Sequence, residues 1–243
     1  MYEKPDIRKQ KIASEKLDII KNKIFKFIKN NIGKISEYDV KEYVVEELAK
    51  EGMISDSEFP IIACDENTSY MHYFPEKSKS KIIKEDCLVM IDLWAKLIEG
   101  GYYADITWMC YTGKRVPGKI KNIFDQVIEA RDYAVDYIGE KLRKAQIPKG
   151  CEVDNAVRKF FGNNEKYFIH GLGHSLGFYN AHGGLFNLNK KCDKKIQIGV
   201  PFTIEPALYF ENEFGIRSEI NCYVNEDYKL LITSSVQDEI VLV

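Results

Sequence analysis

The chain lacks long apolar runs, a strong net charge and closely paired cysteines, and each absence narrows what the protein can be. No apolar run approaches the ~20 residues needed to cross a bilayer, so we expect no membrane span. The basic N-terminal residues are not followed by an apolar segment, so we expect no signal peptide. A net charge of -2 gives no reason to expect nucleic acid as a partner. The six cysteines include no C-x-x-C pair, which predicts reduced thiols in a cytoplasmic protein.

Histidine is also scarce, and the few present are concentrated in one place. Three of the four histidines, His170, His174 and His182, lie in the run F-I-H-G-L-G-H-S-L-G-F-Y-N-A-H, and the fourth is His72. Imidazole ligates metals and moves protons near neutral pH, so this cluster indicates a metal-binding or catalytic site. The alternative is that His170 and His174 are partly buried rings with no metal role.

Four acids lie inside otherwise apolar segments that are rich in Val, Ile, Phe, Tyr and Thr. They are Asp92, Asp105, Glu205 and Glu219, and their segments are predicted to be strands. A carboxylate among buried residues is costly unless a cation or strong donors satisfy it. Arg217 is the one obvious basic partner in these runs. The four acids therefore favour a pair of metal ions over separate buried ion pairs.

The spacing of apolar residues predicts the same order of elements twice along the chain. Helices are expected at residues 12–31 and 36–51, and again at 120–144 and 154–161, each pair followed by the acid-bearing strands. The E-G-G sequence between Asp92 and Asp105 suits a hairpin turn. This order predicts a duplicated, pseudo-symmetric α+β domain.

The order of five separated motifs resembles a known family. His72 is followed by D-L-W-A and A-D-I-T, then H-G-L-G-H-S-L-G, then T-I-E-P-A-L-Y and G-I-R-S-E. This order resembles the pita-bread metallopeptidases, and within them the Xaa-Pro aminopeptidase and prolidase branch. The resemblance implies a pita-bread fold, with duplicated helix-helix-strand halves around a curved antiparallel sheet. It also implies that residues 1–243 form a single catalytic domain, without the separate N-terminal domain of many such enzymes.

The resemblance assigns a role to each candidate residue. Two divalent metal ions would be held by Asp92, Asp105, His174, Glu205 and Glu219. Glu205 would also be the general base toward a metal-bridging water. His72 and His182 would contact the scissile carbonyl and its developing charge. His170 and Arg217 would bind substrate and mark the proline-directed branch. Manganese is expected first because the donors are mostly carboxylates, while cobalt, zinc and iron also suit such a site.

Several positions depart from the family pattern. Trp94 stands where a small residue is usual, and Trp108 stands where a basic residue is common. The stretch between the two aspartates is longer than usual, as is the stretch between His174 and His182, and Gly183 replaces a common acid. Two alternatives follow. His182 could be a surface histidine in a longer loop, and Arg217 could pair with a nearby carboxylate instead of binding the substrate.

The sequence thus predicts a dinuclear metal-dependent exopeptidase that removes the N-terminal residue from peptides, of the Xaa-Pro type. A methionine aminopeptidase is the alternative enzyme, and hydrolysis of a C–N bond in a small molecule is a more distant one. The non-enzyme alternative is an inactive pita-bread module that binds peptides or proteins. The presence of all expected ligands favours an enzyme. A peptide is the expected partner, and a homodimer is left open.

Overall fold

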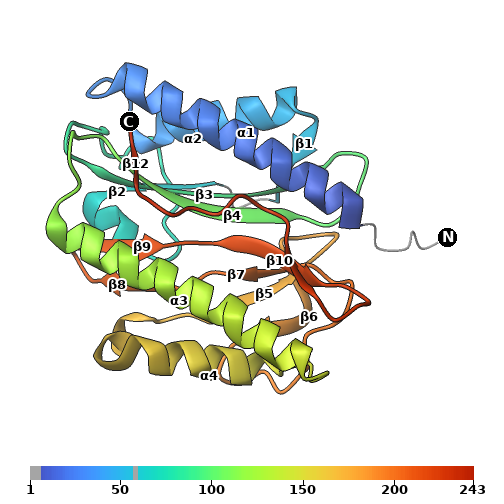
Figure 1. Cartoon of the computed structure of the whole chain (residues 1–243). Helices are drawn as coiled ribbons and strands as arrows, with labels where there is room; N and C mark the ends of the chain where they lie inside the picture. The colour runs from blue at the N-terminus through green and yellow to red at the C-terminus, as the bar shows by residue number, and fades with distance from the viewer. Residues whose placement is uncertain (1–6, 57–59) are drawn as a thin grey trace.

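A pair of helices precedes a strand hairpin twice in the computed structural model, which describes residues 7–56 and 60–243 (Figure 1). The first half contains α1 (Ile7–Asn31), α2 (Glu37–Lys50), β1 (Met53–Ile54), β2 (Ile61–Cys64), η1 (Asp65–Ser69), β3 (Leu88–Leu97) and β4 (Ala104–Tyr111). The helices of the second half are α3 (Gly118–Arg143), α4 (Gly150–Phe161) and η2 (Gly162–Tyr167). Its strands are β5 (Gly173–Leu176), β6 (His182–Leu188), β7 (Phe202–Ile204), β8 (Ala207–Phe210), β9 (Phe214–Arg217), β10 (Ile220–Val224), β11 (Leu230–Ile232) and β12 (Val241–Leu242). The predicted duplicated α+β order is confirmed.

The strands form two larger sheets and one hairpin. The first sheet has the order β1-β3-β4-β12, with β2 also paired to β3, and the second has the order β11-β10-β7-β5-β6. Among the residues that the structure describes, β8 and β9 pair only with each other. The sheets lie against each other in the middle of the molecule, with α1 and α2 outside one and α3 and α4 outside the other (Figure 1).

The amphipathic pattern of the helices explains this layering. On α1, the buried residues Leu17, Ile20, Ile24 and Ile28 recur every three or four positions and pack against the first sheet. Each such side chain contributes roughly 1.5 to 3 kcal/mol on burial, so truncating Ile24 to alanine should cost roughly 2 to 5 kcal/mol. A second core joins α3, α4 and the second sheet to the other face of the first sheet, through residues such as Leu88, Met90 and Met109. In the part of the chain that the structure describes, no helix is both long and apolar enough to cross a membrane.

Local capping sets where two helices begin. At α2, the Ser36 side chain accepts from the Asp39 N–H at 3.2 Å, and the Asp39 carboxylate accepts from the Ser36 N–H at 2.7 Å. The predicted start at residue 36 is therefore accurate. α4 begins earlier than predicted, because the N–H of Lys149 donates to Glu152 at 2.8 Å and caps an extra turn.

The predicted hairpin between the two aspartates is confirmed. β3 and β4 are antiparallel, with Asp92 opposite Thr107 and Trp94 opposite Asp105. The chain reverses through Gly100 and Gly101, whose φ angles of 95° and 110° are ones that L side chains rarely adopt. Residues directly opposite in a sheet share a face, so both aspartates point to the same side.

A side chain joins the two sheets between β4 and β10. Asn221 on β10 accepts from the Asp105 N–H at 2.9 Å, and its amide donates to the carbonyl of Asp105. Gln10 of α1 also donates to the Asn221 amide oxygen, at 3.0 Å. The N–H of Glu219 bonds the carbonyl of Thr107 at 3.3 Å. These bonds fix strand β4 of the first half beside β10 of the second.

Candidate metal centre

The five predicted metal ligands come from both halves of the fold. Asp92 lies on β3 and Asp105 on β4, whereas His174 lies on β5. Glu205 directly follows β7, and Glu219 lies between β9 and β10. The prediction that the two glutamates lie inside strands is therefore wrong.

The chain itself explains where these strands end. Pro206 follows Glu205, and a proline has no N–H to continue a strand ladder. The N–H of Glu219 is committed to a carbonyl of the other half rather than to a neighbouring strand of its own sheet. Both glutamates therefore sit at strand ends, where their carboxylates reach the space between the sheets.

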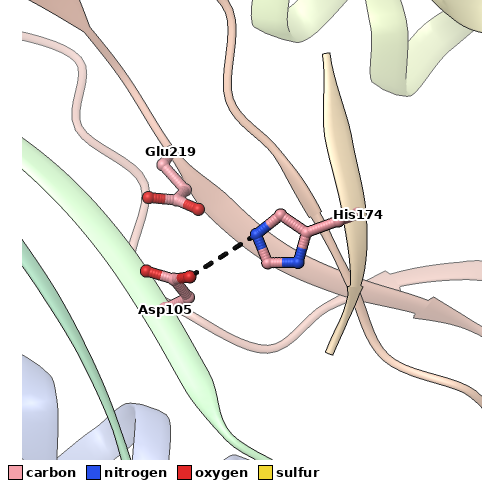
Figure 2. A group of neighbouring side chains, drawn as sticks. All are labelled: Asp105, His174 and Glu219. Carbon is pink, nitrogen blue, oxygen red and sulfur yellow. Dashed lines mark ion pairs between the residues drawn. The ribbon is translucent and has the colours of Figure 1, made fainter. Parts of the chain in front are cut away.

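The donor atoms meet in one cavity of about 480 Å³. The His174 Nε2 atom lies 3.7 Å from an oxygen of Asp105 and 3.6 Å from an oxygen of Glu205. Figure 2 shows Asp105, Glu219 and His174 pointing toward one another, and one donor atom from each lies within 4.8 Å of the others. Asp92 and Glu205 line the same cavity. The structure thus brings together all five residues.

Burial and mutual repulsion make this cluster unfavourable without cations. Burial, with the neighbouring acids, raises the pKa of both Asp105 and Glu219 well above their ordinary values. The pKa of Glu205 is raised to about 7, mainly by burial and against the influence of Arg217. Burial also raises the pKa of Asp92. Crowded carboxylates of this kind cannot all be ionised unless positive charge lies among them.

Two further observations fit divalent ions. Asp92 Oδ1 is buried and has no hydrogen-bond partner within residues 7–56 and 60–243. Burial, aided by His182, lowers the pKa of His174 to about 3, so its ring is neutral. The Nδ1 atom of His174 lies 3.2 Å from the carbonyl of Ser175, and donation there leaves the Nε2 lone pair facing the carboxylates. The donor set therefore suits divalent cations.

Arg217 is the centre of a hydrogen-bond network beside the carboxylates. Its guanidinium forms an ion pair with Asp92 and donates to Thr107 at 2.9 Å and to the Tyr209 hydroxyl at 2.9 Å. Thr107 in turn donates to Glu219 at 2.8 Å, as expected for a hydroxyl on the same face as Asp105. The pairing with Asp92 is the contact that the sequence raised as an alternative to substrate binding by Arg217.

The other three histidines also line the cavity. His170 Nε2 lies 3.1 Å from the Tyr209 hydroxyl, and its Nδ1 lies 2.7 Å from the carbonyl of Gly171. His72 is exposed on the cavity wall. His182 begins β6, and its ring stacks on that of His174 with centroids 4.0 Å apart. His182 is exposed, yet it is held against the donor cluster rather than carried on a long loop.

Three of the departures from the expected pattern have local explanations. The register shifts between His174 and Leu176 where β5 pairs with β6, which accommodates the longer segment before His182. A Cβ at Gly183 would lie 2.6 Å from the carbonyl oxygen of Leu176, so an acid does not fit there. Trp108 points away from the cavity and lies under the ammonium of Lys21, 3.3 Å from its ring centroid.

Three cavity or support residues escaped the sequence interpretation. Tyr209 is the last residue of the T-I-E-P-A-L-Y motif, so its position was a usable signal. Asn221 lies two residues after Glu219, but its bonds to Asp105 join distant parts of the chain. Asp56 lines the cavity from a segment with no recognisable motif.

Comparison with known proteins agrees with this geometry. The profile of metallopeptidase family M24 matches residues 8–226. An uncharacterized peptidase of Methanocaldococcus jannaschii is 29% identical over 89% of this chain and 58% of its own length. A protein of Mycoplasma genitalium, named a candidate Xaa-Pro aminopeptidase, is 28% identical over 95% of this chain and 64% of its own length. The chain thus spans about three fifths of the curated relatives that it matches.

Solved structures show the same architecture. A prolidase from Thermococcus sibiricus superposes with a TM-score of 0.84 at 24% identity, covering 98% of this chain and 62% of that one. An X-Pro aminopeptidase from Thermotoga maritima gives a TM-score of 0.83 at 24% identity, covering 98% and 63% of the two chains. At this identity the likeness shows the fold alone, which is the expected pita-bread fold.

Proposed function

Because the chain belongs to metallopeptidase family M24, we propose that it is a dinuclear metal-dependent exopeptidase that removes the N-terminal residue from Xaa-Pro peptides. We propose further that the chain acts as a single catalytic domain. The resemblance of the motifs to the proline-directed branch supports this substrate class, as do the names of several relatives.

One observation carries the proposal. Five donors from two separate halves converge in a single cavity, and a buried carboxylate oxygen among them has no partner. A module that only binds peptides has no need of a buried cluster whose acids repel one another. The metal ligands in this proposal are Asp92, Asp105, His174, Glu205 and Glu219.

Bound dications would supply Lewis-acid activation of water and of the scissile carbonyl. Among the residues of the chain, Glu205 would remove a proton from the attacking water and deliver it to the nitrogen of the leaving proline as the C–N bond breaks. Thr203 donates to Glu205 at 3.1 Å and so orients this carboxylate. His72 and His182 would donate hydrogen bonds to the carbonyl oxygen as negative charge develops there.

His170 and Arg217 would face the rest of the peptide. Both lie on the cavity wall and are connected through the Tyr209 hydroxyl. Burial, together with the charge of Arg217, lowers the pKa of His170 to about 3, so it would act as a neutral hydrogen-bonding group. Arg217 would contact a substrate carbonyl while holding Asp92 in place.

Manganese is our first choice of metal, since four of the five donors are carboxylates and a single imidazole adds little preference for softer ions. We propose a cytoplasmic location, consistent with the free state of all six cysteines.

The proposal can be tested with protein purified without chelator. Bound metal would be measured by elemental analysis, and hydrolysis by a panel of free-amine peptides with proline or alanine second, in the presence of manganese, cobalt or zinc. We expect two ions per chain and cleavage of Xaa-Pro peptides. Cleavage of Met-Ala peptides at least about tenfold better than any Xaa-Pro peptide would instead indicate a methionine aminopeptidase. Absence of both metal and hydrolysis would favour a binding module.

A further inference from the structure

Asp56 is an acid of the cavity that the proposed reaction does not use. Its carboxylate accepts from the indole N–H of Trp94 and, at 3.3 Å, from the N–H of Ala181. One bond comes from β3 and the other from the segment before His182, so the side chain is held from two directions. A carboxylate can accept about four hydrogen bonds, so Asp56 retains acceptor capacity toward the cavity.

Asp56 has no ion-pair partner in the described part of the chain. No lysine or arginine of residues 7–56 and 60–243 forms an ion pair with it, whereas Asp92 has Arg217. Two dications and Arg217 would more than neutralise the four ligand carboxylates. In the loaded protein, Asp56 would then be the one carboxylate among the cavity-lining residues that the structure describes whose charge neither a metal ion nor Arg217 offsets.

The walls beside Asp56 suit an organic cation. Trp94 and Phe74 line the cavity and meet edge to face, with ring centroids 6.5 Å apart. Aromatic faces attract ammonium and guanidinium groups, and they accept the carbon stem of a long basic side chain. A carboxylate beside two aromatic rings therefore favours a cationic side chain over a neutral polar one.

The substrate's α-amine is the other cationic group that a carboxylate in this cavity can bind. The α-nitrogen lies two bonds from the scissile carbonyl carbon and must stay beside the reacting atoms. Asp56 makes no hydrogen bond with any of the five ligands. It is connected to them through Trp94, the cross-strand neighbour of Asp105, and through Ala181, which precedes the His182 ring that stacks on His174. The four-carbon stem of a lysine can pass an aromatic ring to reach it.

We propose that Asp56, oriented by Trp94, is a specificity-determining residue that selects peptides whose N-terminal residue is lysine or arginine. This inference rests on the proposed exopeptidase function and adds the class of the first residue. Asp56 acts on substrate recognition and takes no part in the bond-breaking step.

The test compares two peptides that differ only in charge. Lys-Pro and norleucine-Pro peptides share the same stem, and only lysine carries the ammonium. We expect the manganese-loaded wild type to prefer the lysine peptide by about tenfold or more in kcat/KM, and Asp56→Asn to lower this ratio to about one. Trp94→Phe keeps a ring but removes the indole N–H, so it should give an intermediate ratio. Asp125→Asn removes a partly exposed acid of α3 outside the cavity and should leave the ratio unchanged.

The outcomes separate this inference from the proposed function. A wild-type ratio near one, or a ratio unaltered by Asp56→Asn, overturns the role of Asp56. An equal loss on both peptides also overturns it, because Asp56 would then bind the α-ammonium. If no peptide is hydrolysed, the proposed function fails. Calorimetry with reduced-amide analogues of the Lys-Pro and norleucine-Pro peptides, on wild type and Asp56→Asn, then still shows whether Asp56 gives a preference for the lysine side chain. Circular dichroism shows whether each variant is folded. If Asp56→Asn does not fold, Trp94→Phe provides the test.

Discussion

Removing the metal should make the protein's stability fall as the pH rises, and Glu205 allows the size of the effect to be worked out. Burial raises the pKa of Glu205 in the folded protein from 4.5 to about 7, with a further contribution from Asp92. Between these values the folded chain binds more protons than the unfolded chain. The contribution of Glu205 to stability is therefore intact below pH 4.5 and is lost as the pH rises to about 7.

The shift corresponds to about 3 kcal/mol at neutral pH, since one pKa unit is worth 1.36 kcal/mol. For a domain of this size, that loss lowers the unfolding temperature by roughly 6 to 12 °C. Thermal unfolding of chelator-treated protein, followed by circular dichroism between pH 5 and pH 8, measures it. The isosteric variant Glu205→Gln cannot ionise there, so it should lose less stability over the same range.

The comparison between the two proteins isolates Glu205 from the other titrating groups. Parallel curves of stability against pH for metal-free wild type and Glu205→Gln would refute the reasoning. So would a difference in stability between the two proteins that favours the wild type more at pH 8 than at pH 5. Adding manganese to the wild type should restore its stability at pH 8, because a dication favours the ionised carboxylate.

Three further predictions concern individual residues. Asp105→Asn and Glu219→Gln should each lower bound metal below two ions per chain and abolish hydrolysis, and unchanged metal content and rate would contradict their assignment as ligands. His72→Ala should keep the metal and lower kcat by roughly 10²- to 10³-fold, since it removes a contact to developing charge, and metal loss would instead make His72 a ligand. Arg217→Lys should raise KM for Xaa-Pro peptides several-fold with metal retained, because an ammonium cannot reproduce the planar fork. An unchanged KM with weaker metal binding would limit Arg217 to holding Asp92.

Much of the fold could be predicted because its signals are local. The apolar spacing on α1 identifies the helix and its buried face, and Ser36 with Asp39 marks the start of α2. The glycines between Asp92 and Asp105 identify the hairpin, whose register puts both acids on one face. The candidate metal ligands could be proposed because an acid in an apolar run needs an explanation. Their roles stay predictions.

The remainder depends on contacts between residues far apart in sequence. Nothing around Asn221 indicates that its amide bonds the backbone of Asp105, more than a hundred residues earlier. The pairing of Arg217 with Asp92 likewise needs β9 and β3 to be in place. The sequence around Asp56 does not indicate a role in the cavity, because that role depends on contacts with Trp94 and with the segment before His182.

The division of the ligands between the two halves has a thermodynamic consequence. The first half supplies Asp92 and Asp105, and the second supplies His174, Glu205 and Glu219. Neither set alone completes the cluster, so affinity for the ions depends on how closely β4 and β10 stay docked, which is the contact that Asn221 secures. An ion held by ligands from both halves would consequently act as a crosslink between them. Such an ion raises the free energy of separating them by an amount that grows with the logarithm of the free metal concentration.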